Sequence, residues 1–406
     1  MPCRFCSNKT IQINNFGPMP IANGFSSTIE PDSYRFQLIT AFCDSCKLFQ
    51  LVEQPNKELM FHSNYPFFTG LSKTMTNHFH NMVVDNLTPV LVSKDSHFVV
   101  EIGCNDGTLL EKVKELGFRH LGVDPSSNVI EKAKAKGISA ELNFFGENTA
   151  QKIVEQHGKA TIIIAANVIC HLPDLKDLAK GIKELLAPEG IFIFEEPYAG
   201  SMLKLTSFDQ FYDEHVYIFS LMSIRNIFES LGLELFDAIP QETHGGSMRY
   251  FIANNGRKTK TMRLQELLDD EKANGLDTLK AYENFEKRCQ KTKVALKEIL
   301  TELKESHKTI AGYAATSKST TVLNYCGIDS NLISFICDST PEKVGKFAPG
   351  SNIPIISVED MRKSPPDYLV LFGWNHEKEI MEKEKEINKN GVKWIKYIPE
   401  VRVVNS

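Results

Sequence analysis

The stretch 195–217 concentrates residue types that can transfer protons. It reads EEPYAGSMLKLTSFDQFYDEHVY, and its titratable side chains include Glu195, Glu196, Tyr198, Asp209, Tyr212, Asp213, Glu214, His215 and Tyr217. Isolated charges are very costly in a dry interior, so these groups must face solvent or line a polar cleft. The interleaved aromatic residues want partial burial, which favours the cleft. His215 has an ordinary pKa near neutrality, which suits it to proton transfer.

A second candidate site is the segment FVVEIGCNDGTLL, residues 98–110. A β-branched run ends at Glu101, and a loop that lets the backbone approach a ligand leads into a helical pattern. The residues of this segment that we assign to cofactor binding are Glu101, Gly103, Asn105, Asp106 and Gly107. The loop lacks the dinucleotide fingerprint and resembles the first motif of class I methyltransferases, whose ligand is S-adenosylmethionine. Asp124 ends the next strand, where its carboxylate can accept hydrogen bonds from ribose hydroxyls.

Loops after the next strands carry further candidate cofactor contacts. In AELNFFGENTA, Asn143 and Phe144 lie where an amide partner and a stacking face for adenine would be useful. A core role for Phe144 is an equal alternative. In AANVICHLPDL, Asn167 and His171 lie at the carboxyl end of a strand, beside the expected methyl-donor site. The residues alone favour a structural loop histidine for His171.

Paired cysteines near the N-terminus predict a metal site. Cys3 and Cys6 form one C-x-x-C motif, and Cys43 and Cys46 form another. Two such knuckles can supply four thiolates in a tetrahedron, the geometry of a closed structural zinc site. A redox dithiol needs one pair and not two. Because four protein ligands leave no open position, this zinc should stabilise the fold and take no part in the chemistry.

The C-terminal half carries candidate substrate contacts. HGGSMRYFIA reads as a glycine turn and a strand with Arg249, a candidate partner for an anion or an enolate. Near residue 310 a βαβ pattern restarts, with Gly312, Ser317 and Lys318 at a strand-to-helix turn and Asp338 at the end of the next strand. This pattern mimics a nucleotide-binding half-domain without its glycine fingerprint, so a docking domain is the alternative.

Alternating strand and helix patterns over 97–240 predict a doubly wound parallel sheet. The expected strands are 98–102, 119–123, 161–166 and 190–195, and the expected helices are 108–116, 127–135, 147–157 and 175–186. We expect a zinc-binding domain at 1–60, an aromatic and helical connector at 61–95, a cofactor-binding domain at 96–240, a strand and solvated helical connector at 241–306, and a Rossmann-like α/β domain at 307–406. The helix of the first connector should end at Leu87, because Pro89 disfavours helical geometry at the residue before it.

Taken together, these segments resemble the sugar C-methyltransferases, three-domain enzymes that methylate a carbon of nucleotide-linked deoxysugars. FDQFYDEHVYIFS is similar to the family signature F-D-x-x-Y-x-E-H-x-x-x-F-S. The resemblance places Tyr212, Glu214 and His215 on its catalytic positions. YPFFTGLS aligns with the family pattern Y-x-Y-x-S-S-x-S, keeping Tyr65 as a catalytic candidate but with Phe67 for the second tyrosine. GWN, which ends in Asn375, and HGGSMR also match, while the family's A-x-K-G turn is altered to TSKST around Lys318.

The resemblance implies a C-methyltransferase that acts on a nucleotide-linked 4-keto-6-deoxy sugar, with S-adenosylmethionine as cofactor and a structural zinc. Substrate contacts would come from Tyr198, Arg249, Lys318 and Asn375. A carbon beside a ketone is acidic enough for a positioned base to deprotonate, and the resulting enolate can attack an electrophilic methyl group. For the 4-keto sugars of this family the acidic carbon is C3. Alternatives are an O- or N-methyltransferase of a related sugar and a zinc-stabilised, non-catalytic binding or scaffold protein.

Composition limits the other functional classes. The 406 residues are 42% hydrophobic and 24% charged, as in soluble globular proteins. A net charge of −5 gives no electrostatic reason to expect a nucleic-acid partner. No apolar run approaches the ~20 residues that span a bilayer, so we expect a cytoplasmic protein with no membrane partner. We expect it to be a monomer or a small homo-oligomer.

Overall fold

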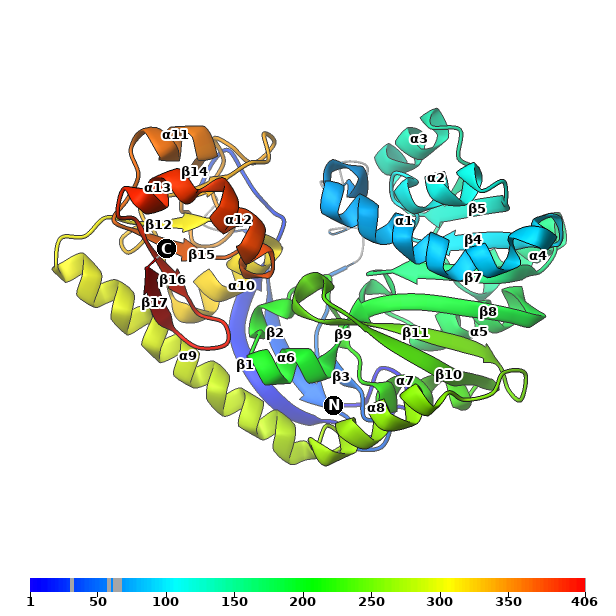
Figure 1. Ribbon diagram of the computed structural model, residues 1–406. Helices are drawn as coiled ribbons and strands as arrows, with labels where there is room; N and C mark the ends of the chain where they lie inside the picture. The colour runs from blue at the N-terminus through cyan, green and yellow to red at the C-terminus, as the bar shows by residue number, and fades with distance from the viewer. Residues whose placement is uncertain (30–32, 57–59, 61–67, 406) are drawn as a thin grey trace.

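The computed structural model describes residues 1–29, 33–56, 60 and 68–405. These residues form a four-stranded, a seven-stranded and a six-stranded sheet, with the N-terminal sheet between the lobes of the other two (Figure 1). The candidate catalytic Tyr65, and Phe67 beside it, lie outside the described residues. Among the described helices, none has both the length and the apolar character that a bilayer crossing needs.

The N-terminal sheet is antiparallel in the order β1-β2-β3-β9. Its strands are β1 (Ile11–Pro20), β2 (Arg35–Phe42), β3 (Phe49–Leu51) and β9 (Tyr217–Ile218). The first three come from the cysteine-rich segment, whereas β9 follows His215 in the sequence. The backbone N–H of Leu51 also donates to the carbonyl of Val216 at 2.7 Å. This sheet therefore holds the chain directly after the candidate catalytic histidine.

The central sheet has the order β10-β11-β8-β7-β4-β5-β6. Its strands are β4 (Phe98–Ile102), β5 (Arg119–Asp124), β6 (Ala140–Leu142), β7 (Ala160–Ala166), β8 (Leu186–Pro197), β10 (Leu233–Gln241) and β11 (Ser247–Asn254). The five strands β8-β7-β4-β5-β6 are parallel, which confirms the doubly wound sheet. We had assigned the strand after HGG to the connector 241–306, but it pairs with β8 in this sheet. The bounds of the five expected units stay a prediction.

Helices precede and connect the central strands, and the first five of them are expected from the sequence. They are α1 (Lys73–Leu87), α2 (Thr108–Glu115), α3 (Ser127–Ala135), α4 (Glu147–His157), α5 (Leu175–Leu185), α6 (Ala199–Leu205) and α7 (Leu221–Glu229). Short 3-10 helices are η2 (Thr69–Leu71), η3 (Thr88–Ser96), η4 (Ile169–His171), η5 (Phe208–Gln210), η6 (Thr243–Gly245) and η7 (Trp374–His376). α1 ends at Leu87, as Pro89 led us to expect, and buries Phe79, Met82 and Val83. It crosses one face of the central sheet (Figure 1).

The helical connector consists of α8 (Met262–Ala273) and the long α9 (Leu279–Glu305), which runs past the N-terminal sheet to the C-terminal lobe (Figure 1). We expected a solvated connector. Instead, one side of α9 is buried, at Tyr282, Phe285, Cys289, Leu296 and Leu300. Tyr282 stacks on Phe42 with ring centroids 4.2 Å apart. The helix is therefore amphipathic, and its charged residues form only the outer face.

The C-terminal sheet has the order β14-β13-β12-β15-β16-β17. Its strands are β12 (Ile310–Tyr313), β13 (Ile336–Asp338), β14 (Ile355–Ser357), β15 (Tyr368–Leu371), β16 (Lys393–Lys396) and β17 (Arg402–Asn405), and its helices are α10 (Ser317–Cys326), α11 (Val358–Lys363), α12 (Glu377–Lys383) and α13 (Lys385–Lys389). Only β17 is antiparallel to its neighbour. This confirms the Rossmann-like pattern of the last hundred residues.

Candidate active site

The loop between β4 and α2 turns sharply at its glycines. Gly103 has φ +70° and Gly107 has φ +76°, which favour glycine. A Cβ on Gly103 would lie 2.2 Å from Cγ2 of Val168, so no other residue fits without moving the neighbouring loop. The loop lies at the carboxyl end of β4, next to the ends of β5 and β7.

Asp124 anchors this loop. One oxygen of its carboxylate accepts a hydrogen bond from the N–H of Asn105 at 3.0 Å, and the other accepts from the N–H of Ser126 at 2.9 Å. Burial raises the pKa of the Asp124 carboxyl. Each carboxylate oxygen can accept a further hydrogen bond, so the hydroxyls of a ribose have acceptors here.

Buried polar atoms beside Asp124 lack partners among the described residues. Glu101 is buried, and burial, followed by the charges of Asp124 and Asp106, raises the pKa of its carboxyl well above the ordinary value. Among the described residues, Oε2 of Glu101 and Oδ1 of Asn167 have no hydrogen-bond partner. Buried acceptors without partners are costly, so they indicate a ligand that brings donors. S-adenosylmethionine has an ammonium group, a sulfonium and ribose hydroxyls, and the residues present fit it.

The predicted adenine contacts lie beside the acid. The N–H of Asn143 donates to the carbonyl of Asp124 at 3.0 Å, and the Asn143 side chain is exposed. Phe144 is half-buried, and its carbonyl accepts from Thr149 at 2.8 Å. Phe145 is the ring that enters the core. The exposed part of Phe144 is thus available to a stacking partner, although the residue also has contacts within the protein.

The turn η2 closes over the cofactor loop, which the sequence did not indicate. The N–H of Thr69 donates to Oδ1 of Asn105 at 3.0 Å, and the N–H of Gly70 donates to Oδ2 of Asp106 at 3.1 Å. A Cβ on Gly70 would lie only 2.7 Å from that oxygen. The side chains of Asn105 and Asp106 therefore fix the start of α1 to the cofactor loop.

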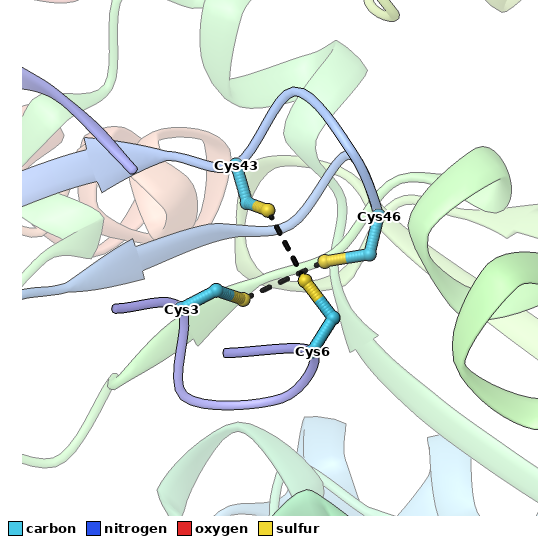
Figure 2. Close-up of side chains that lie close together, drawn as sticks. All are labelled: Cys3, Cys6, Cys43 and Cys46. Atoms are coloured by element: carbon cyan, nitrogen blue, oxygen red, sulfur yellow. Dashed lines mark hydrogen bonds between the residues drawn. The ribbon is translucent and has the colours of Figure 1, made fainter. Parts of the chain in front are cut away.

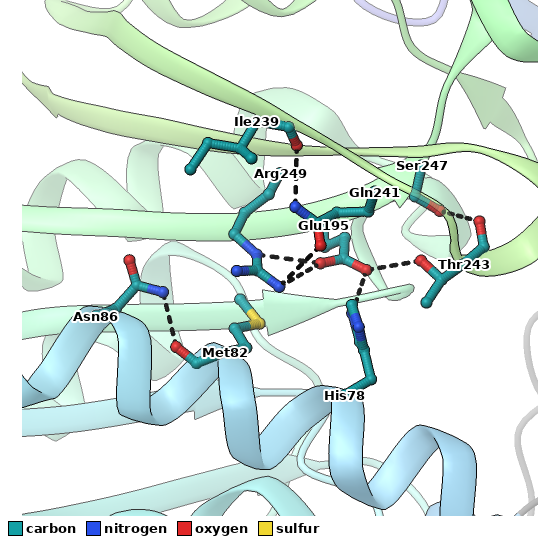
Figure 3. Close-up of polar contacts among 9 residues, drawn as sticks. All are labelled: His78, Met82, Asn86, Glu195, Ile239, Gln241, Thr243, Ser247 and Arg249. Atoms are coloured by element: carbon teal, nitrogen blue, oxygen red, sulfur yellow. Dashed lines mark hydrogen bonds and ion pairs between the residues drawn. The ribbon is translucent and has the colours of Figure 1, made fainter.

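Arg249 belongs to a buried ionic network at the end of β8 (Figure 3). Its Nε and Nη2 lie 3.1 and 3.0 Å from Oε2 of Glu195, and Nη2 also reaches Gln241 at 3.4 Å. On the other oxygen, Glu195 accepts from His78 of α1 at 2.7 Å and from Thr243 at 2.9 Å. Burial opposes ionisation of Glu195, but these donors and charges hold its pKa below the ordinary value. The guanidinium of Arg249 is therefore already paired with Glu195.

Tyr212 and His215 form a hydrogen-bonded pair. Nδ1 of His215 lies 2.7 Å from the carbonyl of Gln210, and Nε2 lies 2.7 Å from the hydroxyl of Tyr212. Because a carbonyl can only accept, Nδ1 carries the proton, and Nε2 of the neutral ring accepts from Tyr212. Burial, then the charges of His171 and Lys318, lower the pKa of His215 well below its ordinary value. The ring is therefore neutral at pH 7, with its basic nitrogen toward Tyr212.

His171 lies beside this pair. Its ring stacks on that of His215, with centroids 5.2 Å apart and 25° between the planes. Burial lowers the pKa of His171 to about 4. Both of the imidazoles that the sequence singled out are therefore brought together, at the carboxyl end of β7.

Polar side chains from the N-terminal, central and C-terminal parts meet beneath the pair. Oε1 of Glu214 accepts from the amide of Asn23 at 2.8 Å, and Oδ1 of Asn23 accepts from the hydroxyl of Ser317 at 2.9 Å. Asp213 accepts from the N–H of Ala22 at 2.9 Å. Burial raises the pKa of Asp213 to about 6. These contacts fix the Tyr212–His215 segment to both of its neighbours.

Lys318 enters the same junction from α10. Its Nζ lies 4.9 Å from the ring centroid of Trp374, and it has no hydrogen-bond partner among the described residues. The Trp374 indole donates to Asp209 at 2.7 Å, as does the hydroxyl of Tyr397. Asn375, another candidate substrate contact, follows Trp374 in η7 and is partly exposed.

The side chain of Tyr198 contacts the helical connector. Its hydroxyl hydrogen-bonds Glu271 of α8, and this contact, after burial and the charge of that acid, raises its pKa. Glu271 in turn accepts from the N–H groups of Leu221 and Met222 at 2.6 and 3.0 Å, at the start of α7. The structure therefore gives the Tyr198 hydroxyl a partner in the connector, while the Tyr198 N–H donates to Gly246 at 3.1 Å.

The paired cysteines converge on one point (Figure 2). The Sγ atoms of Cys3 and Cys46 are 3.6 Å apart, those of Cys6 and Cys43 are 3.5 Å apart, and all four lie within 4.8 Å of one another. A tetrahedron with Zn–S bonds of about 2.3 Å has sulfurs about 3.8 Å apart, so the thiols fit a zinc ion. In both knuckles the N–H of the fifth residue donates to the carbonyl of the first, Ser7 to Cys3 and Lys47 to Cys43.

These features define a class. The chain is a methyltransferase that depends on S-adenosylmethionine, with a structural zinc site. Family models agree along its length: "Putative zinc binding domain" matches residues 3–61, "Methyltransferase domain" matches 78–238, and "C-methyltransferase C-terminal domain" matches 242–399. C-methyltransferase NovU of Streptomyces niveus is 32% identical over 409 aligned residues, which span 100% of this chain and 97% of NovU. The chain therefore belongs to the family of C-methyltransferases, and the expected alternative of an inert scaffold protein is not retained.

Two further matches cover a smaller share of this chain. The ubiquinone biosynthesis O-methyltransferase of Bartonella bacilliformis is 29% identical over 94 residues, which cover 23% of this chain and 38% of that enzyme. Among solved structures, the magnesium protoporphyrin IX methyltransferase of Synechocystis PCC 6803 covers 45% of this chain and 88% of its own, with 18% identity and a TM-score of 0.34.

Several residues of the site belong to no motif that would identify them from the sequence. Gln210 fixes His215 through its carbonyl, and its side chain donates to the carbonyl of His244 at 2.6 Å. Asn23 and His78 lie far from the catalytic segment in sequence, so only the folded chain brings them there. His244 could have been noticed, because it directly precedes a Gly-Gly pair.

Proposed function

We propose that the enzyme methylates a carbon of a nucleotide-linked 4-keto-6-deoxy sugar, at C3, through an enolate. The observation that carries this proposal is the Tyr212–His215 pair. A carbon acceptor needs a base to remove a proton, whereas the lone pair of an amine needs none. A buried neutral imidazole with its basic nitrogen directed to a more exposed phenol is such a base.

The cofactor residues would hold S-adenosylmethionine along the ends of β4, β5 and β7. We assign the ribose to Asp124, the adenine to Asn143 and Phe144, and the methionine end to Glu101, Gly103 and Asn167. Asn105, Asp106 and Gly107 would shape the loop. His171 would lie at the entrance of the cofactor site. When bound, this cofactor supplies an electrophilic methyl group on a positively charged sulfur.

His215 would take the sugar proton, either directly or through Tyr212. In the relay, the phenol oxygen receives the proton from carbon while its own proton moves 2.7 Å to Nε2 of His215. The carbonyl of Gln210 then stabilises the imidazolium, because it already accepts from Nδ1. Glu214 would hold the segment through Asn23. Tyr65 stays a candidate that the described residues do not reach.

The substrate would approach from the junction of the central and C-terminal lobes. Lys318 and Asn375 are our candidates for contacts there. Arg249 and Tyr198 have their polar groups engaged by Glu195 and Glu271, so we propose that both position other residues. Arg249 would then orient Glu195 and, through it, α1.

The test is mass spectrometry of products formed from S-adenosylmethionine and a panel of nucleotide-linked 4-keto sugars, paired with NMR of solvent deuterium incorporation in the absence of the methyl donor. We expect a mass gain of one methyl group on carbon, and exchange of the α-proton that His215→Asn abolishes. Methylation on oxygen or nitrogen, or exchange by His215→Asn at the wild-type rate, would contradict the proposal.

A further inference from the structure

Lys318 is a buried amine: burial lowers its pKa, and the charge of Asp209 raises it. Its side chain is 8% exposed, and Nζ makes no hydrogen bond to any described residue. The face of Trp374 is its neighbour, at 4.9 Å from the ring centroid. Burying an ammonium group without hydrogen bonds is strongly unfavourable, and a cation–π contact recovers only part of that cost.

The helix that carries Lys318 is fixed to the catalytic segment. Thr316 caps α10 by accepting from the N–H of Ser319 at 3.1 Å. The hydroxyl of Thr321 donates to the carbonyl of Phe211 at 2.8 Å, and Phe211 directly precedes Tyr212. The charge of Lys318 lowers the pKa of both His215 and His244. Lys318 is therefore held within electrostatic reach of the Tyr212–His215 pair.

Other polar atoms of this junction also lack partners. Among the described residues these are Oδ1 of Asp209, Oε1 of Gln210 and Nε2 of His244, all buried. Trp374 reaches over the turn at Gly245, where a Cβ would lie 2.1 Å from its ring. Unpartnered donors and acceptors at one junction indicate a polar ligand with a carbonyl and hydroxyl groups.

Arg249, the other candidate cation, already has partners within the protein. Its Nε and Nη2 are within 3.1 Å of Glu195, and Nη2 also reaches Gln241. A cation that already has a carboxylate partner gives little to a developing oxyanion unless that pair breaks.

We propose that Lys318 donates a hydrogen bond to the ketone oxygen of the sugar and holds the oxyanion when the neighbouring carbon is deprotonated. This inference rests on the proposed function. The carbon-bound proton passes to the Tyr212–His215 pair, the electron pair of the C–H bond forms the C=C bond, and the C=O π electrons move to oxygen beside Nζ. The sugar then carries one negative charge and the imidazole one positive charge, so charge is balanced.

The test compares Lys318→Met, which keeps the length and the packing on Trp374 but removes the charge, with Lys343→Met. Lys343 lies in the same lobe, where it donates to the carbonyl of Ala315 at 2.7 Å. Three readouts are needed: solvent deuterium exchange of the 4-keto sugar without methyl donor, kcat and KM for methyl transfer, and affinity for S-adenosylmethionine by calorimetry.

We expect Lys318→Met to lower the exchange rate and kcat by about 10²–10³-fold, as removal of an oxyanion donor does, with unchanged cofactor affinity. Lys343→Met should exchange at the wild-type rate. A rise in KM at unchanged kcat would overturn the inference and make Lys318 a contact to another part of the substrate, such as the diphosphate. Wild-type enzyme that neither exchanges nor methylates any sugar of the panel would contradict the proposed function itself.

Discussion

The central and the C-terminal sheets carry the same strand–loop–helix–strand unit, and both units end in an aspartate with the same hydrogen bonds. Asp124 accepts from Asn105 and Ser126 at 3.0 and 2.9 Å. Asp338 accepts from the N–H groups of Ala315 and Thr340 at 2.7 and 2.8 Å. In each unit one bond fixes the loop after the first strand, and the other fixes the turn two residues on.

What differs is the content of the loop. In the central unit, the buried acceptors Oε2 of Glu101 and Oδ1 of Asn167 lack partners among the described residues. In the C-terminal unit, Lys343 lies 3.7 Å from Asp338 and places a cation beside the acid. The start of α10 instead contacts Asn23 and carries Lys318 into the junction. One scaffold thus serves as a cofactor site in one lobe and as a docking element in the other.

The junction between these units depends on the zinc-bearing sheet, so loss of the metal should have the largest effect. Gln50 donates to Sγ of Cys3 at 3.2 Å, and β3 pairs with β9 directly after His215. Structural zinc contributes about 10–16 kcal/mol of apparent binding free energy at pH 7 in zinc-finger peptides. We expect Cys46→Ser to lose the metal, lower the melting temperature and abolish methyl transfer.

Metal analysis and thermal melting check this expectation. Cys326→Ala, which changes a buried lone cysteine, should keep one zinc per chain. Zinc absent from protein purified without chelators would contradict the assignment, as would Cys46→Ser with unchanged folding.

The second prediction separates catalysis in the junction from cofactor binding in the central unit. His215→Asn should lower kcat for methyl transfer by about 10²–10⁴-fold, the usual contribution of a general base. Its affinity for S-adenosylmethionine, measured by calorimetry, should stay that of the wild type. His157→Asn at the C-terminal end of α4 is the control and should change neither quantity. A parallel loss of cofactor affinity would mean that the two regions are not separate.

The third prediction concerns pH. Because burial and the charges of His171 and Lys318 lower the pKa of His215, its ring stays neutral as the pH falls through 6.5. The acid limb of kcat/KM should therefore lie below pH 6.5. Lys318→Met removes one of these charges and should move the limb toward higher pH. A wild-type limb at or above 6.5, in a pH–rate profile, would show that another group is the base.

The smallest effect should come from the bridge between the lobes. Asn23→Ala removes hydrogen bonds to Glu214 and Ser317, and typical net contributions predict a loss of about 1–3 kcal/mol in the free energy of unfolding. Urea denaturation measures this loss. Asn255→Ala on the exposed turn after β11 should leave the free energy unchanged, and equal losses in both variants would remove the bridge from the explanation.

The sequence was sufficient for the elements whose signals are local. The strands 98–102 and 161–166 come from runs of apolar residues, the helix 127–135 from a mixed apolar and charged pattern, and the zinc site from cysteine spacing. β6 has three residues, too few for a clear pattern, and the pairing of β11 with β8 is not local. The same limit applies to the site. Tyr212 and His215 were found because they are neighbours in sequence.

The partners that decide how side chains act could not be found in this way. Arg249 pairs with Glu195, 54 residues away in the sequence, and Glu214 accepts a hydrogen bond from Asn23, 191 residues away. Such contacts follow from how the sheets pack, and no spacing rule along the chain encodes them. Arg249, the candidate partner for an enolate, is therefore engaged by Glu195, whereas Nζ of Lys318 has no hydrogen-bond partner among the described residues.

The difference between the two units can be measured directly by calorimetric titration of S-adenosylmethionine into the wild type, Asp124→Ala and Asp338→Ala. Both substitutions remove a carboxylate that accepts hydrogen bonds from two backbone N–H groups. Each variant therefore shows what loss of such a carboxylate does when the other unit is left intact. We expect one site per chain, weakened by about 1.5–3 kcal/mol in Asp124→Ala, the range for a hydrogen bond to a charged group, and unchanged in Asp338→Ala. Two sites per chain, or weakening by Asp338→Ala with Asp124→Ala unaffected, would contradict the assignment of the cofactor to the central unit.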